Sequence, residues 1–327
     1  MRKALSSLLR LLLLRYEITC LLTLIALFAI GGYLNRALFD YYTLSTLLTF
    51  SAEVGIIAVG VAFLMISGEF DMSVGAVGAL TAISFITLIN SNLPGFLALL
   101  VSIGLACAIG LINGLITIKS GAPSFIVTLA TAFTIRGILL IVTGGFPVSY
   151  KGAILPLSVR ILGGSLPFGL RLSAIWFVVA VAVMTLVLEF TRYGNHVFAT
   201  GGNPTVAREM GVNTSRVKLI NFVLTSFFAS LSGLFIVARL MSADPLLLTG
   251  AELEGIAAAV VGGCSLLGGY GSIVGAALGS VLISLIRVTL TLTGAPVVWY
   301  RSIVGGILVA TALIDAVILR KLRQKFL

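Results

Sequence analysis

The sequence predicts an all-α polytopic membrane protein with about ten transmembrane helices, some of them short or broken. Of its 327 residues, 59% are hydrophobic and only 10% are charged, whereas a soluble domain carries roughly 25% charged residues. So few charges could not cover a water-exposed surface. The apolar residues also gather into repeated segments of about 20, which is the length that crosses a bilayer.

Nine segments have the length and composition of complete spans. They are 17–34, 46–67, 73–91, 95–118, 124–143, 173–190, 216–239, 270–293 and 297–319. A tenth segment, 253–263, is short and rich in Ala and Gly, and the sequence leaves open whether it crosses the membrane fully. Counting all ten places both termini, Lys119 and the 192–218 loop on the same side.

The basic residues behind the net charge of +10 lie mainly in segments beside the predicted spans, so they indicate membrane topology rather than a nucleic-acid-binding surface. Short basic segments beside spans mark the cytoplasmic side, which predicts a multi-pass protein with both termini cytoplasmic. Three basic residues in the long 144–172 loop would face outward, but long loops weigh less in this rule. The basic clusters are Arg2, Lys3, Arg10 and Arg15; the 192–218 loop; and Arg320, Lys321, Arg323 and Lys325.

We expect residues 1–327 to form a single transmembrane domain with two substantial loops. The 144–172 loop is predicted to be periplasmic and large enough to meet an extracytoplasmic partner. Within it, 157–162 fits either a short strand or an interfacial helix. The 192–215 loop is predicted to be cytoplasmic.

An internal repeat is suggested by a shift of 200 residues. In the 30 positions 47–76, 11 residues are identical to their counterparts in 247–276, among them Gly55, Gly68 and Gly75. The biased composition supplies several of these matches by chance. Duplicated halves with broken helices near the midplane are typical of transporters.

The most polar internal stretch, 201–211, predicts a two-turn helix with both ends marked. Asn203 is a good N-cap, Pro204 suits the first helical position, and Gly211 can adopt the left-handed conformation that ends a helix. A capped helix between two spans fits either an ordinary solvated loop or a docking element. Its residues are Asn203, Pro204, Thr205, Val206, Ala207, Arg208, Glu209, Met210 and Gly211.

The second distinctive stretch, 68–75, places two acids and a glycine inside a long apolar run. Asp71 or Ser73 could simply cap the following helix. The functional alternative is a helix break beside a translocation pathway, where irregular backbone must be buried or line a cavity. We take Ser67, Glu69, Asp71, Ser73, Thr128 and Arg136 as candidates for the break or the pathway, with Asn113, Ser124, Thr131 and Thr134 as weaker polar candidates.

Other ionisable residues within or near spans are also functional candidates, because charge in a membrane is costly. They are Glu53, Arg239, Glu254 and Arg287, together with Glu252. An ion pair between Glu53 and Arg136 is conceivable. The chain contains no P-loop, no metal-ligand spacing and no hydrolase motif, so the sequence predicts neither an enzyme nor a metal or cofactor bound by this chain.

Four blocks together resemble the permease subunits of bacterial ABC importers for ribose and other simple sugars, including the autoinducer-2 permeases. The blocks run in family order over 45–310. They are Gly68-Glu-Phe-Asp-Met-Ser-Val-Gly75; Pro123-Ser-Phe-Ile-Val-Thr-Leu129 with Arg136-Gly137; Gly201-Gly-Asn203 through Gly211-Val-Asn213; and Glu252 through Gly263 with Ser265-Leu-Leu-Gly-Gly269 and Gly271-Ser272. Glu69-Phe70, Gly255 and Cys264 depart from the usual pattern, which leaves the solute open.

The resemblance implies a type II ABC importer-like fold in the bacterial inner membrane, and an importer for a sugar or similar small polar solute. It implies a second permease copy or paralogue, cytoplasmic ATPase subunits that hold ATP and Mg, and a periplasmic solute-binding protein. The 203–211 helix would then be the coupling helix that docks on the ATPase. An ion-coupled secondary transporter using Glu53, Glu69 and Asp71, or a non-transporting scaffold or enzyme, are the alternatives.

Overall fold

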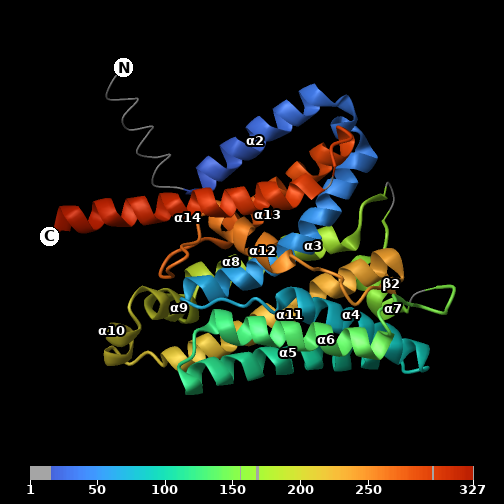
Figure 1. The fold of residues 1–327 in the computed structure, drawn as a ribbon, viewed down its shortest axis with the longest axis horizontal. Helices are drawn as coiled ribbons and strands as arrows, with labels where there is room; N and C mark the ends of the chain where they lie inside the picture. The colour runs from blue at the N-terminus through green and yellow to red at the C-terminus, as the bar shows by residue number, and fades with distance from the viewer. Residues whose placement is uncertain (1–15, 155, 167–168, 297, 327) are drawn as a thin grey trace.

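The computed structural model describes residues 16–154, 156–166, 169–296 and 298–326, and it is a bundle of helices (Figure 1). The basic residues Arg2, Lys3, Arg10 and Arg15 lie outside the described residues. The elements are α2 (Tyr16–Leu34), η1 (Arg36–Phe39), α3 (Tyr41–Ile66), α4 (Val74–Asn90), α5 (Gly95–Ser120), α6 (Ser124–Thr143), β1 (Val148–Ser149), α7 (Leu157–Gly163), α8 (Leu172–Phe190), α9 (Arg192–Gly202), α10 (Pro204–Glu209), α11 (Thr214–Leu240), β2 (Ser242–Ala243), α12 (Ala251–Val261), α13 (Ile273–Leu292) and α14 (Val298–Phe326).

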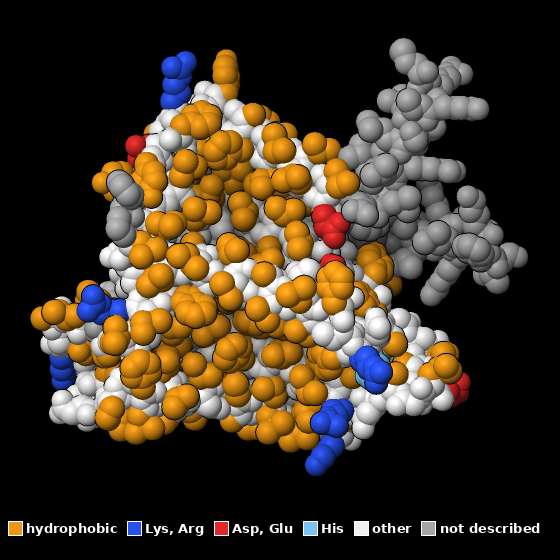
Figure 2. All heavy atoms as spheres, turned by 180° about the vertical axis from the view of Figure 1, so that it is seen from behind, with side chains coloured by type: hydrophobic (Ala, Val, Ile, Leu, Met, Phe, Trp, Pro, Cys, Tyr) orange, Lys and Arg blue, Asp and Glu red, His pale blue; other side chains and the backbone are white. Residues whose placement is uncertain are grey.

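All ten predicted spans fall on helices, so the prediction of an all-α polytopic membrane protein is confirmed. Within the described residues, seven helices are long and apolar enough to cross a membrane: α2, α3, α5, α6, α8, α11 and α13. Helix α4 and the first part of α14 are shorter apolar helices. Figure 2 shows hydrophobic side chains over most of one face of the bundle, with Lys and Arg at its margins.

The bundle has two distinct ends, which orient the site described below. Helices α9 and α10 project at one end, at the left of Figure 1, and α14 runs out toward the same end. At the other end, β1 and β2 form a two-stranded antiparallel sheet in which Val148 pairs with Ala243. We refer to these as the α10 end and the β-ribbon end.

Helix α3 forms the centre of the bundle, and most of its length is buried. It packs against α11, α13, α12 and α8. Polar side chains of α11 bond to α3 carbonyls along their whole contact. Asn221 Nδ2 donates to Phe63 O at 3.2 Å, Thr225 Oγ1 to Gly60 O at 3.0 Å, and Ser232 Oγ to Glu53 O at 2.7 Å. The order of these contacts makes the two helices antiparallel and fixes their register.

The segments related by the 200-residue shift have the same local architecture. In each, a helix runs toward the α10 end, a turn follows, and a second helix returns: α3 and α4 in the first, α12 and α13 in the second. The second helices begin at equivalent positions, Val74 and Ile273, within one residue. Because both units run in the same direction, the repeat is parallel rather than inverted.

Helix α12 crosses only part of the bilayer by itself. Its 11 residues reach about 17 Å at 1.5 Å per residue, roughly half of a 30 Å hydrocarbon core. The preceding residues 244–250 form turns that connect α12 to β2 at the β-ribbon end. The turn after α12 lies against α9 at the α10 end. The chain therefore passes from one end of the bundle to the other, partly as irregular backbone.

The structure settles one local feature that the sequence left open, and it differs from the prediction in a second. The ambiguous 157–162 segment is helical, as α7, and it packs on α11 and α5 rather than joining a sheet. Helix α9 occupies residues that were predicted to belong to the 192–215 loop, although its three glycines disfavour helix. Its start is nevertheless capped, since Thr191 Oγ1 accepts a hydrogen bond from Gly194 N at 3.3 Å.

Candidate coupling and translocation elements

The short helix α10 is held at both ends by the contacts that its sequence predicts. Asn203 Oδ1 accepts hydrogen bonds from the backbone N–H groups of Thr205 and Val206, each at 3.1 Å. At the other end, Gly211 has φ +88°, and its N–H donates to Arg208 O at 2.9 Å. Asn213 then caps α11 by accepting from Arg216 N at 2.9 Å. The connection between α9 and α11 is therefore a short helix with hydrogen-bonded ends rather than an irregular loop.

One face of α10 is anchored and the other is free. Ala207 is buried against its neighbours, and Arg208 Nε donates to Thr214 Oγ1 at 2.9 Å. Val206 is 51% exposed and Met210 is 79% exposed. Residues four apart share a helix face, so these two side chains form one exposed apolar surface, which we call the Val206–Met210 pair.

Helix α9 touches the turns of both repeat units through backbone at Gly201. A Cβ placed on Gly201 would collide with Ile66 O and would lie 2.6 Å from Gly269 N. Gly269 N itself donates to Ile66 O at 2.9 Å. Only glycine permits three backbone segments to approach this closely. The end of α9, just before α10, is therefore in direct contact with the ends of α3 and the 262–272 turn.

Residues 67–73 separate α3 from α4 as irregular backbone packed against α6. Phe70 N donates to Ser124 Oγ at 3.0 Å, and Met72 N donates to Thr128 Oγ1 at 2.9 Å. Ser124 and Thr128 lie one turn apart on α6, which matches the spacing of the two N–H groups. Hydroxyl groups of α6 thus accept hydrogen bonds from backbone N–H groups that have no partner within a helix. Irregular backbone inside a membrane requires such partners.

A buried polar network follows the break. Asp71 Oδ1 accepts from Ser73 N at 2.7 Å and from Ser73 Oγ at 2.6 Å. Asn113 Nδ2 donates to Ser73 Oγ at 3.0 Å, and Thr131 Oγ1 donates to Asn113 Oδ1 at 2.7 Å. Asp71 does not cap α4 itself; it orders the residue at the N-cap position. Asp71 Oδ2 is buried without a hydrogen-bond partner among the described residues.

The other candidates from this stretch have separate partners. Glu69 Oε1 lies 2.5 Å from Lys218 Nζ, which ties the break to the first turns of α11. Ser67 is buried and donates to Leu64 O at 2.8 Å. Arg136 donates from Nη1 to Pro245 O at 2.7 Å and so supports the irregular residues before α12. The structure brings Asp71, Ser73 and Thr128 together, whereas Arg136 belongs to a different contact.

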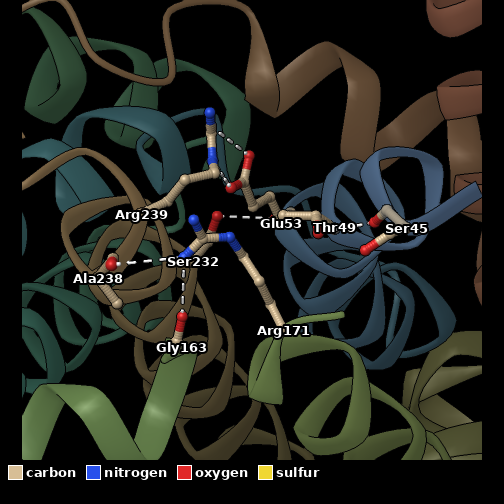
Figure 3. Close-up of polar contacts among 8 residues, drawn as sticks. All are labelled: Ser45, Thr49, Glu53, Gly163, Arg171, Ser232, Ala238 and Arg239. Carbon is tan, nitrogen blue, oxygen red and sulfur yellow. Dashed lines mark hydrogen bonds and ion pairs between the residues drawn. The ribbon is translucent and has the colours of Figure 1, made fainter. Parts of the chain in front are cut away.

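The conceivable pair between Glu53 and Arg136 is wrong, because Glu53 pairs with Arg239. Arg239 Nε lies 2.7 Å from Glu53 Oε1 and Nη2 lies 3.0 Å from Oε2, so the guanidinium contacts both carboxylate oxygens (Figure 3). The antiparallel packing of α3 and α11 brings together residues 186 positions apart. Sequence spacing gave no signal for this partner.

Comparison with known proteins places residues 43–312 in a family described as branched-chain amino acid transport system / permease component. The xylose/arabinose import permease protein XylH of Sulfolobus acidocaldarius is 38% identical over 86% of this chain and 79% of its own length. The autoinducer 2 import system permease protein LsrC of Escherichia coli O9:H4 is 32% identical over 91% and 86%. The ribose import permease protein RbsC of Escherichia coli K12 is 32% identical over 90% and 91%. No solved structure matches the chain.

These relatives are components of transport systems rather than enzymes, and they favour the ABC mechanism over the ion-coupled alternative. The family match covers most of the chain, including the break, both repeat units and α10. Several relatives exceed 30% identity over nearly the whole chain. The chain therefore belongs to the branched-chain amino acid transport system / permease component family, as the multi-pass membrane permease subunit of an ABC importer.

Proposed function

We propose that this permease imports a sugar or similar small hydroxylated solute across the bacterial inner membrane, and that α10 is its coupling helix. ATP and Mg would be bound by cytoplasmic ATPase subunits, and a periplasmic binding protein would deliver the solute. A second copy or paralogue would complete the membrane unit. The names of the relatives, which import xylose or arabinose, ribose and autoinducer 2, support this solute class.

The Val206–Met210 pair is the observation that carries the coupling role. A solvated loop needs no pair of exposed apolar residues on a doubly anchored helix, whereas a docking helix gains contact area from one. Contact at Gly201 between α9 and the turns of both repeat units offers a direct mechanical route into the bundle. The α10 end, with 192–215, would then be cytoplasmic, and the β-ribbon end, with 144–172, would be periplasmic.

In this arrangement, the break at 67–73 and its polar network are candidates for the pathway lining. Ser67, Glu69, Asp71 and Ser73 belong to the segment between α3 and α4, and Thr128 contacts that segment from α6. Arg136 would act as a positioning residue for 244–250 through its bond to Pro245 O. Movement at α9 would reach the break through Ile66, the last residue of α3.

Co-purification of the ATPase tests this proposal. The tagged chain is isolated from its native membrane in mild detergent, as wild type, as Val206→Ser/Met210→Ser, and as Arg216→Ala. Arg216 is exposed in the neighbouring first turn of α11 and serves as the matched control. We expect wild type and Arg216→Ala to retain a P-loop ATPase and the double variant to lose it.

Solute uptake in cells provides the second readout. The double variant should lose uptake while its membrane level and monodispersity match those of the Arg216→Ala chain, because both altered side chains are exposed. Normal ATPase recovery and normal uptake in the double variant would remove α10 from the coupling role. Charge reversal at Arg208 and Glu209 then tests whether the polar face of α10 also contributes to coupling.

A further inference from the structure

A polar cavity of about 500 Å³ lies among α3, α11, α12, α13 and α14, and none of the 67–73 residues lines it. Its volume is in the range of pockets that hold small molecules. Polar and aromatic side chains from five helices converge on it. Those that matter below are Phe50, Glu53, Arg239, Glu254, Arg287 and Tyr300. We call this the arginine cavity.

A second cavity of about 260 Å³ adjoins it and shares Phe50 and Arg239. Its other lining residues include Ser45, Thr49 and Arg171. Arg171 directly precedes α8, and its Nη1 donates to Gly163 O at 3.2 Å, near the end of α11 (Figure 3). The polar lining therefore continues from the arginine cavity toward the β-ribbon end, which gives a solute a hydrophilic route from that side.

Two arginines of the arginine cavity are held in fixed orientations. Arg239 is fixed by its two contacts with Glu53. The guanidinium carbon of Arg287 lies 4.6 Å from the Phe50 ring centre and 5.8 Å from that of Tyr300. Such cation–π contacts use the face of the guanidinium and leave its N–H edge free.

No described residue accepts a hydrogen bond from the side chain of Arg287. Charged side chains in a membrane normally pair or line a pathway, because an unpaired charge there is costly. Glu254 attracts Arg287 electrostatically but makes no ion pair with it within 4.0 Å in the described part of the chain. Oriented N–H donors without acceptors, facing a cavity of ligand size, indicate a ligand that supplies the acceptors.

The charges of the two cavities indicate the sign of that ligand. Four arginines line them, Arg171, Arg239, Arg287 and Arg301, against two acids, Glu53 and Glu254. This leaves an excess of two positive charges, which attracts anions and repels amines. An arginine fork matches a carboxylate in a bidentate manner. The hydroxyl groups of Ser45, Thr49 and Thr249 donate to backbone carbonyls, and their oxygens can accept hydrogen bonds from a hydroxylated solute.

We propose that the arginine cavity holds the transported solute, and that this solute is a hydroxylated carboxylate of the sugar-acid type, bound through Arg287. The inference rests on the proposed function and narrows its solute class. Glu254 then tunes the site, because its negative charge opposes the carboxylate while its oxygens accept hydrogen bonds from hydroxyl groups.

Direct binding to the permease–ATPase complex in nanodiscs, without a binding protein, tests the inference. The probes are D-ribonate and D-ribose, which differ in charge and closely resemble each other in size. We expect saturable binding of ribonate, measured as a concentration-dependent rise in thermal midpoint, and weaker binding of ribose. Equal binding of both probes, or no saturable binding of ribonate, would overturn the assignment.

Three variants separate ligand contact from structural damage. Arg287→Gln should weaken ribonate binding by about tenfold or more, the value of a hydrogen bond to a charged group. Arg160→Gln, the same change at an exposed position on α7, should leave binding unchanged. Glu254→Gln should strengthen ribonate binding, a gain that a merely damaged fold would not produce.

Equal effects of Arg287→Gln and Arg160→Gln, or weaker ribonate binding in Glu254→Gln, would contradict the proposal. If Arg287→Gln does not fold, Glu254→Gln alone decides through the sign of its effect. None of these variants touches α10. Absence of saturable ribonate binding to the wild-type complex, with α10-dependent ATPase co-purification intact, would therefore refute the site and leave the proposed function standing.

Discussion

Gly68 and Gly268, 200 positions apart, meet in the bundle as the equivalent turn residues of the two repeat units. A Cβ on Gly268 would lie 2.9 Å from the Cα of Gly68 and 3.3 Å from the Cα of Gly201. Gly68 and Gly268 both have positive φ, +86° and +80°. Positive φ favours glycine at both positions of the repeat, and a side chain at Gly268 would in addition press on the backbone of Gly68.

Gly201→Ala should disrupt this junction, whereas Gly202→Ala should be tolerated. A Cβ at Gly201 collides with Ile66 O, while one at Gly202 would meet only Gly269 Cα at 3.9 Å. Helix propensity favours alanine equally at both positions. We expect a sharp loss of monodisperse protein and of ATPase co-purification for Gly201→Ala alone. Equal yields for the two variants would contradict the packing at this junction.

Asn113→Ala should destabilise the protein by about 1–3 kcal/mol, because it removes a buried amide that donates to the buried Ser73 Oγ and accepts from the half-buried Thr131 Oγ1. The thermal midpoint of the detergent-purified chain measures this loss. Thr134→Ala on α6 is the control, since its exposed hydroxyl bonds only to Ala130 O of its own helix. Midpoints that fall equally for both variants would mean that the buried network adds no stability.

The Glu69–Lys218 pair should behave as a coupled unit in a charge swap. Both side chains are partly buried, 13% and 21% exposed, so Glu69→Lys or Lys218→Glu places like charges together. The double variant restores opposite charges, and we expect it to recover much of the lost stability, with a coupling energy of about 0.5–3 kcal/mol. Additive losses in the double variant would show that the two residues do not interact.

Cys264 should resist thiol reagents in the resting protein. It is buried in the 262–272 turn, and burial raises the pKa of its thiol to about 12. Only the thiolate reacts, so almost no reactive form exists at pH 8, and the fraction grows as pH rises toward 12. Maleimide labelling in a Cys20→Ser/Cys107→Ser background measures the rate. Rapid labelling at pH 8 would mean that the turn is open.

Local sequence rules predicted much of the fold and of α10. Hydrophobic length located every span, and Asn203, Pro204 and Gly211 marked the ends of a helix as short as six residues. These features depend on interactions within a few residues, which sequence patterns record directly. Whether the repeat is parallel or inverted could not be predicted, because it depended on whether the short 253–263 segment crosses the membrane.

The polar partners were not predictable, since they depend on how helices pack. Glu53 meets Arg239 rather than Arg136 because α3 lies antiparallel to α11, with its register set by three side-chain bonds to α3 carbonyls. Likewise, Ser124 and Thr128 support the break only because α6 runs beside 67–73. An ionisable residue in a span signals that a partner exists, but not where in the chain it lies.

The long separation of Glu53 and Arg239 has a consequence for biosynthesis. A ribosome adding about 5–20 residues per second needs roughly 10–40 s to make the 186 residues between them. During that interval, α3 resides in or near the translocon without its arginine. A central acidic residue opposes insertion by about 3 kcal/mol, which the apolar remainder of α3 offsets. Insertion of α3 must therefore precede neutralisation of its carboxylate, so a nascent chain stalled before α11 would display an unpaired acid to membrane quality-control proteases.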